Sequence, residues 1–454
     1  MILRRRRPRD VVAVVVVGAG FSGLAAALRL VDAGLDVVVL EAADRVGGRT
    51  WTVDLEGEPV ELGGMWTGPD QPLLAALLER YGRTTFPQPV DGRDLLVQGG
   101  LLVDDATQRW AEVSAYVDAL DDLARGVPGD RPWQAADAER LDATTLDRWL
   151  EQRVEDPLVR RHLEVLLTEL MCVPADELSL LTLLHAASTS GSLESALGTR
   201  GGAQEQRVVG GMHAVAVAMA DELGGRVRLG TPLDRLSWND DAAIVDLVGG
   251  TLLARDVVVA MAPSACEGLD VEPVLPLRRT FAQRRMPMGS VVKTVAVYDR
   301  PFWRDGGLSG AVLDLDGPFG HCVDASRPDG ERGVLVSFLA GEQARALSDA
   351  ALGPGASHVR RELWTDRATT WFGPRAADLR HYVDLDWSSV RYVAGGYSGA
   401  MAPGAWQEAG PGLVAPVGCL HWAGSETSGS WTGYVEGALI AGNRAAEEIL
   451  AART

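Results

Sequence analysis

A glycine-rich turn between a valine run and an alanine-rich segment is the strongest constraint on this chain. Residues 11–17 are continuously apolar and β-branched, as in a strand buried on both faces of a parallel sheet. The turn reads Gly18-x-Gly20-x-x-Gly23, and we predict a helix over residues 22–33. The first glycine permits a tight turn, the second admits a pyrophosphate, and the third lets helix and strand pack closely. The pattern predicts a dinucleotide-binding loop rather than a glycine turn without a ligand.

An acidic residue completes the unit at the expected distance. Glu41 ends a second predicted strand, residues 36–40, and follows Gly23 by 18 positions. A carboxylate there can accept hydrogen bonds from an adenosine ribose, while the helix N-terminus favours phosphate. The loop therefore predicts a site for an AMP moiety. FAD and NAD share that moiety, so the loop alone does not distinguish them.

Composition narrows the class of protein. The 454 residues allow two or three domains, and a formal net charge of -19 makes nucleic acid an unlikely partner. The cysteines are scattered without a C-x-x-C spacing, so we expect neither a metal site nor a disulfide framework. Reduced thiols in a cytoplasmic protein are expected at these four positions: Cys172, Cys266, Cys322 and Cys419. No run of about 18 apolar residues predicts a membrane span. Residues 4–7 are interpreted as a basic tail before the first strand, not as a signal peptide.

The remaining pattern alternates between nucleotide-type and other segments. We predict short strands through residues 227–253, with turns at 239–241 and 249–250, and further strands at 256–261, 290–298 and 333–340. Residues from about 110 to 200 carry helical periodicity in several pieces, which include 145–152, 158–170 and 177–188. Helices are also expected at 71–81 and 435–450, and one long or two short helices at 349–372. Such alternation indicates two interwoven, discontinuous domains.

The segment 41–50, with the sequence EAADRVGGRT, decides between the cofactors. It resembles the flavin-dependent amine oxidases, the family of monoamine, polyamine and L-amino-acid oxidases. The family usually has arginine where Ala43 stands, which puts one adenosine-side contact in doubt. Further similar segments follow in the family's order, so that the resemblance covers residues 11–450 and is nearest to the monoamine oxidase branch: 61–69, 201–204, 210–211, 288–293, 301–303, 423–427 and 431–438.

The resemblance implies an α/β fold, a Rossmann-like FAD-binding domain interwoven with an α+β substrate-binding domain, known as the amine oxidase or GR2-type flavoprotein fold. We assign residues 8–85, 205–285 and 385–454 to the FAD-binding domain, and 86–204 and 286–384 to the substrate-binding domain. The expected FAD contacts are Gly18, Gly20, Phe21, Ser22, Gly23, Glu41, Ala42, Arg45, Gly48, Arg49, Gly63, Gly64, Met65, Trp66, Leu233, Trp387, Gly424, Ser425, Glu426, Tyr434 and Val435. Gly396 occupies the position at which mammalian-type relatives have a flavin-linked cysteine, so we expect non-covalent FAD.

Three residues resemble the family's catalytic positions. A lysine equivalent to Lys293 holds a water against flavin N5, although from the strand pattern alone it would be a solvent-facing lysine. Tyr397 and Tyr434 resemble the two walls of an aromatic cage, which would accept a neutral amine over the flavin; without the resemblance they would be core or interface tyrosines. Substrate contacts are expected from these tyrosines and from Met171, Cys172 and Gln204.

The same comparison bears on the substrate and on rival functions. Gly64 is followed by Met65 rather than by the arginine of L-amino-acid oxidases, and no deep carboxylate for a polyamine can be located from sequence. We therefore expect a hydrophobic primary amine, arylalkyl or cycloalkyl, oxidised to an imine while O₂ becomes H₂O₂. Diamine, polyamine or L-amino-acid oxidation, a related desaturase and a flavin-bound scaffold stay as alternatives. Mammalian-type members of the family carry a membrane anchor after the closing helix, whereas this chain stops at Thr454, so we expect a soluble enzyme. A homodimer is left open.

Overall fold

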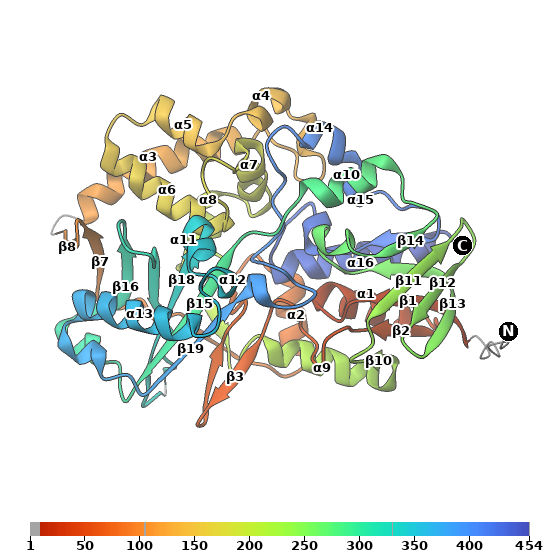
Figure 1. Cartoon of the computed structure of the whole chain (residues 1–454), viewed down its shortest axis with the longest axis horizontal. Helices are drawn as coiled ribbons and strands as arrows, with labels where there is room; N and C mark the ends of the chain where they lie inside the picture. The colour runs from red at the N-terminus through yellow and green to blue at the C-terminus, as the bar shows by residue number, and fades with distance from the viewer. Residues whose placement is uncertain (1–9, 104–105, 329, 454) are drawn as a thin grey trace. The chain divides into compact units, whose positions relative to one another are not determined.

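The computed structural model describes residues 10–103, 106–328 and 330–453, and the basic residues 4–7 lie outside that description. The chain divides into two compact units (Figure 1). Unit 1 is Met1–Gly48, His213–Pro287 and Ala405–Thr454, and unit 2 is Arg49–Met212 and Met288–Gly404. Residues 49–85, 205–212 and 385–404, which we assigned to an FAD-binding domain, lie in unit 2.

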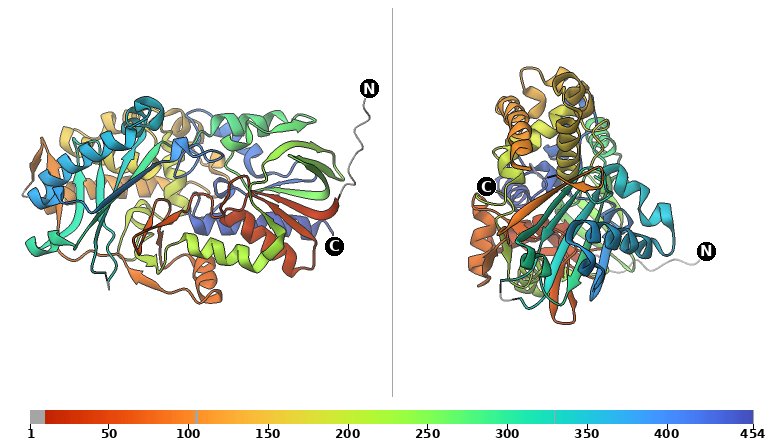
Figure 2. Two further views of the ribbon diagram at one scale, coloured as in Figure 1. Left: turned by 60° about the horizontal axis from the view of Figure 1, so that its bottom comes forward. Right: turned by 90° about the vertical axis from the view of Figure 1, so that its left-hand side faces the viewer.

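Unit 1 contains the predicted βαβ unit. Strand β1 (Asp10–Val17) pairs in parallel with β2 (Val37–Leu40) and with β13 (Gly250–Val259), and α1 (Phe21–Asp32) connects the first two. The sheet order is β10-β2-β1-β13-β12-β11-β14, with β20 also on β13. Figure 2 (left) shows α1, α9 and α16 on one side of these strands. The other elements are α9 (His213–Leu223), β10 (Val227–Arg228), β11 (Leu233–Trp238), β12 (Ala243–Leu247), β14 (Asp270–Glu272), α10 (Leu277–Arg285), α14 (Trp406–Ala409), α15 (Pro411–Val414), β20 (Leu420–Trp422) and α16 (Val435–Ala451).

One prediction in unit 1 needs correction. Residues up to 253 and residues 256–261 were expected in separate strands, but residues 250–259 form the single strand β13. Its first half pairs antiparallel with β12, and nearly its full length pairs in parallel with β1, from Leu252 opposite Asp10 to Val259 opposite Val17. Because β1 pairs on both sides of Arg255 and Asp256, these residues do not interrupt the strand.

Unit 2 is built on a sheet with the order β19-β15-β18-β17-β16-β7-β8. Strand β15 (Val291–Tyr298) is buried along its entire length between β18 (Gly333–Ala340) and β19 (His381–Asp386). Alternate residues serve two cores: Val292 and Ala296 pack with the tryptophans of α13, whereas Val291 and Val295 pack with Met65 and Cys172. Figure 2 (right) shows this sheet between α13 and the helices α3 to α7.

The helices of unit 2 agree with the sequence pattern. The predicted helices at 71–81, 145–152, 158–170 and 177–188 are α2 (Pro72–Arg80), α5 (Leu146–Arg153), α6 (Pro157–Met171) and α7 (Leu180–Thr189). Segment 349–372 forms two helices, α12 (Asp349–Leu352) and α13 (Ala356–Phe372), because Gly353 and Gly355 between them have positive φ. The helix predicted at 435–450 is α16 of unit 1.

The remaining elements of unit 2 were not singled out from sequence. They are β3 (Thr52–Leu55), β4 (Glu58–Glu61), β5 (Trp66–Thr67), β6 (Thr85–Pro87), β7 (Arg93–Gln98), β8 (Leu101–Leu102), α3 (Ala106–Ala124), α4 (Ala138–Ala143), α8 (Leu193–Leu197), β9 (Gln206–Val208), β16 (Leu308–Asp314), β17 (His321–Asp324) and α11 (Gly341–Ala346). Within the described ranges, none of the helices combines the length and the apolar character that crossing a bilayer requires.

Candidate active site

The glycine loop of unit 1 has the geometry that its spacing predicts. Gly18 has φ +103°, and a Cβ there would lie 2.6 Å from the carbonyl oxygen of Ala260. A Cβ on Gly23 would overlap the carbonyl oxygen of Gly18, so helix and strand touch through backbone atoms. Around Gly20 the nearest atom to a Cβ is the Gly48 Cα, 3.9 Å away. The second glycine thus leaves open space, as an approaching pyrophosphate requires.

Glu41 organises the loop from the end of β2. Its carboxylate accepts hydrogen bonds from the backbone N–H groups of Ala19 and Ala43, each at 2.8 Å. Arg45 donates through Nη2 to the Gly48 carbonyl at 2.9 Å, and burial lowers the pKa of its guanidinium while Glu41 acts in the opposite direction. These contacts hold the segment 41–48 against the loop.

The loop fits the AMP and pyrophosphate half of a dinucleotide. Helix α1 begins after Gly20 with no side-chain cap and no acidic residue in its first turn. Its N-terminal N–H groups and partial positive charge are therefore suited to phosphate oxygens. Gly18, Gly20 and Glu41 would hold the adenosine side, with Arg45 as a nearby cation.

The C-terminal part of unit 1 carries the other predicted FAD contacts. Gly424, Ser425 and Glu426 follow strand β20, and the buried Glu426 carboxylate accepts from Ser425 Oγ at 3.2 Å. Helix α16 starts at Val435, with Tyr434 at its N-cap and no side-chain cap. This second helix N-terminus could face the negative charge that arrives on a flavin ring when it is reduced. Leu233 is half-buried at the start of β11.

Lys293 is the notable charge of unit 2, and it does not face solvent. Its side chain, 2 % exposed, lies on central strand β15, where Nζ donates to the Gly63 carbonyl at 2.7 Å and contacts Met65 Sδ at 3.1 Å. Burial lowers the pKa of Lys293 to about 7, partly offset by Glu61. A lysine with that pKa can hold or move a proton near neutral pH.

Aromatic rings surround this ammonium. The Nζ lies 5.9 Å from the ring centroid of Trp66 and 5.6 Å from that of Phe338, which is the cross-strand partner of Lys293. Phe338 in turn meets the ring of Tyr397 edge-on, with centroids 6.0 Å apart. The structure therefore brings Lys293, Trp66 and Tyr397, all candidates from sequence, into one cluster, with Phe338 as a member that sequence analysis missed.

Two predicted cofactor residues donate side-chain hydrogen bonds to backbone carbonyls in and beside this cluster. Arg49 Nη1 donates to the carbonyl oxygen of Tyr397 at 2.7 Å, and Trp387 Nε1 donates to the carbonyl of Leu62 at 2.8 Å. Gly63 packs its Cα against the backbone of Arg49 and Thr50, where a side chain would not fit. The first glycine of the Gly-Gly pair in segment 61–69 thus serves close backbone packing beside Lys293.

A buried ion pair behind Lys293 was also missed. The Glu61 carboxylate accepts hydrogen bonds from Met212 N at 2.7 Å and from Arg207 Nη2 at 3.3 Å. The side chains of Glu61 and Arg207 are both buried. Burial raises the pKa of Glu61, whereas Arg207 and Lys293 lower it. Glu61 stands in the quoted segment 61–69, so its place in that motif was the available signal.

The predicted substrate residues lie at the end of helix α6. Met171 is its last residue and is half-buried, and the fully buried Cys172 follows with φ +55°. The Cys172 carbonyl accepts from Ser290 N at 2.8 Å, and the neighbouring Gly289 carbonyl accepts from Gly396 N at 2.9 Å. Met171 and Cys172 are thereby brought beside the segment that carries Tyr397. Gln204 lies in the turn before β9, and Tyr434 belongs to unit 1, so the two-tyrosine cage stays a prediction.

Comparison with known proteins identifies the family. The model of the family "Flavin containing amine oxidoreductase" matches residues 21–450. Amine oxidase [flavin-containing] B of Sus scrofa is 33 % identical over 452 residues, covering 96 % of this chain and 86 % of its own. Putrescine oxidase bound to putrescine has a TM-score of 0.92 at 31 % identity, covering 98 % of this chain and 100 % of the other.

A second solved structure, cyclohexylamine oxidase from Brevibacterium oxydans IH-35A, has a TM-score of 0.92 at 34 % identity and covers 97 % of this chain and 99 % of its own. The predicted fold class is confirmed by these structures. The cofactor is FAD, held non-covalently, and Gly396 offers no side chain for a bond to it. With a dinucleotide loop, a buried lysine among aromatic rings and likeness along nearly its whole length, the chain belongs to the flavin-containing amine oxidoreductases and is an FAD-dependent amine oxidase.

Proposed function

We propose that the enzyme oxidises a primary amine whose reacting end lies against the aromatic cluster of Lys293, Trp66, Phe338 and Tyr397. The main support for this proposal is the burial of Lys293 among aromatic rings. Lysine side chains are almost never fully buried, so one in this position indicates a chemical or structural role. Bound FAD would take two electrons from the amine α-carbon and pass them to O₂, giving H₂O₂ and an imine that water hydrolyses.

The side chains would orient the substrate and control protons. We assign Tyr397, 38 % exposed, as one face against the amine, since its ring edge is held by Phe338 and its carbonyl by Arg49. Tyr434 is proposed as the second face, in keeping with its half-buried position at the start of α16. Apolar surroundings of this kind favour the neutral amine, whose lone pair oxidation requires. Lys293 Nζ would hold a water molecule beside the reacting atoms.

Two substrate classes are supported by different observations. An arylalkyl or cycloalkyl amine agrees with the apolar side chains of Met171 and Cys172 and with the likeness to a cyclohexylamine oxidase. A diamine agrees with the likeness to a putrescine oxidase and with a buried carboxylate described below. No arginine follows Gly64, which supports neither class but counts against an amino acid.

A peroxide-coupled assay over benzylamine, cyclohexylamine, 1,4-diaminobutane and L-amino acids tests the proposal, together with anaerobic bleaching of the flavin spectrum. We expect bleaching by at least one amine and turnover to aldehyde or ketone plus ammonia. Turnover of an amino acid alone would overturn the substrate assignment, and a desaturase or a flavin scaffold would leave the spectrum unchanged with every amine.

We also infer a cytoplasmic location, which the buried free thiols of Cys172, Cys266, Cys322 and Cys419 support. Fractionation of cells that express the full chain tests this inference. Sedimentation of the holoenzyme tests whether it forms a homodimer.

A further inference from the structure

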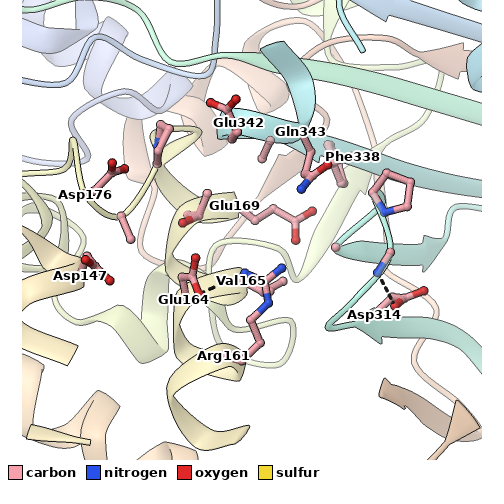
Figure 3. Close-up of a pocket in the computed structure, with 17 residues that line it drawn as sticks. Asp147, Arg161, Glu164, Val165, Glu169, Asp176, Asp314, Phe338, Glu342 and Gln343 are labelled. Atoms are coloured by element: carbon pink, nitrogen blue, oxygen red, sulfur yellow. Dashed lines mark hydrogen bonds and ion pairs between the residues drawn. The ribbon is translucent and has the colours of Figure 1, made fainter. Parts of the chain in front are cut away.

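A cavity of about 310 Å³ lies within unit 2 (Figure 3). Phe338 belongs both to its lining and to the aromatic cluster, whereas Lys293, Trp66 and Tyr397 do not line it. Its walls come from α5, α6 and α11, from β18 and from the end of β16 with the loop that follows. A volume of this size can hold a small ligand. Because one ring lines the cavity and also meets Tyr397, the cavity is adjacent to the proposed position of the amine.

The charge of this cavity is strongly one-sided. A single cationic side chain, Arg161, lines it, and that guanidinium already contacts Glu164 at 3.0 Å and the Leu315 carbonyl at 2.8 Å. The lining carboxylates are six: Asp147, Glu164, Glu169, Asp176, Asp314 and Glu342. Glu342 and Asp176 are exposed, so the negative charge extends to solvent and would attract cations.

Glu169 differs from the other five carboxylates. It is 9 % exposed, and among the described residues its Oε1 is a buried oxygen with no hydrogen-bond partner. Asp314, by comparison, accepts from Trp371 Nε1 at 2.9 Å and from Arg367 Nε at 2.9 Å. Figure 3 shows the Glu169 carboxylate directed into the space between α6 and the strands. A buried oxygen without a partner costs stability unless a ligand completes it.

The position of Glu169 favours a cation for two further reasons. It lies in the last turn of α6, where the helix dipole adds negative potential. It also precedes Cys172 by three positions and its own carbonyl accepts from Cys172 Sγ at 3.5 Å, so it shares the helix end that carries the predicted substrate residues. Burial raises the pKa of the Glu169 carboxyl well above its ordinary value, and a bound ammonium would restore its charge.

We propose that Glu169 binds the second ammonium group of a diamine or polyamine whose first amine is oxidised beside Tyr397. The inference rests on the proposed function and deepens it by naming the substrate class. The aliphatic spacer of such a substrate would lie along Phe338, and the acidic residues at the solvent side would draw in the dication. Glu169 then determines specificity and takes no part in bond breaking.

The test compares 1,4-diaminobutane with n-pentylamine, which has a methyl group where the diamine has its second nitrogen. In the native holoenzyme we expect kcat/KM to favour the diamine by about 10- to 100-fold, the range of a hydrogen bond to a charged group. In Glu169→Gln that preference should disappear through loss of the diamine, while n-pentylamine changes by less than about 3-fold. Glu164→Gln, five residues earlier on α6 and paired with Arg161, is the matched control and should keep the preference.

The outcomes separate the two proposals. Bleaching of the flavin by n-pentylamine with no preference for the diamine would refute the role of Glu169 and leave amine oxidation intact. Equal loss with both amines in Glu169→Gln, at an unchanged flavin spectrum, would likewise refute it by indicating a structural effect. If neither amine bleaches the native enzyme, the proposed function itself fails. If Glu169→Gln does not fold, the native diamine to pentylamine ratio alone decides.

Discussion

The third glycine of the dinucleotide loop can be tested apart from cofactor binding. In Gly23→Ala, the new methyl group would overlap the Gly18 carbonyl oxygen and lie 3.1 Å from Ala260 Cβ. Neither neighbour can move freely, because one is backbone and Ala260 N is bonded to the Val17 carbonyl at 2.9 Å. Overpacking costs about 3 kcal/mol at the upper end, and the helix propensity of alanine offsets about 1 kcal/mol. The expected net loss is about 2 kcal/mol.

For a unit of this size, such a loss lowers Tm by roughly 4–8 °C. The measurement is thermal unfolding of the FAD-free protein, followed by titration with FAD. Gly20→Ala is the control, since a Cβ there meets only Gly48 Cα at 3.9 Å. Its N-cap cost is about 1 kcal/mol or less. We expect Gly20→Ala to unfold near the native protein but to bind FAD weakly. A Gly23→Ala apoprotein that melts within 2 °C of native would refute the packing argument.

Three further predictions concern charged groups. Burial lowers the pKa of Lys293 to about 7, so its ammonium form is present below that pH. We therefore expect kcat/KM for O₂ to fall as the pH rises through about 7. In Lys293→Met, flavin reoxidation measured by stopped flow should be about 100-fold slower and should not depend on pH. The Arg360 side chain is buried between Asp384 and a second aspartate. Arg360→Met should therefore lower the free energy of unfolding, measured with urea, by about 3–5 kcal/mol. An unchanged urea midpoint would contradict this. Burial by itself lowers the pKa of His421, but two carboxylates, Glu448 among them, raise it above 6.5. The stability that protonated His421 contributes is therefore fully present below pH 6.5 and is lost as the pH rises through the raised pKa. Melting temperatures of His421→Asn, measured across this range, should lack that dependence on pH.

Local chemistry made much of the fold predictable. The β-branched run 11–17, the glycine spacing and Glu41 specify a βαβ unit whose contacts are close in sequence, and the structure confirms β1, α1 and β2. The apolar runs at residues 290–298 and 333–340 likewise predicted β15 and β18. What local pattern could not give was pairing: β13 was divided in prediction because the constraint on Arg255 and Asp256 comes from β1, far away in the chain.

The site shows the same division. Sequence alone determined the family, the cofactor and the identity of Lys293 and Tyr397 as candidates, because motifs record residue types and order. Only the tertiary structure decided that Lys293 is buried, since the face of a strand that meets solvent depends on what packs against it. Glu169 was invisible in sequence for the same reason. A carboxylate near a helix end is ordinary, and its unpartnered burial in an acidic cavity exists only once α6 packs against the sheet.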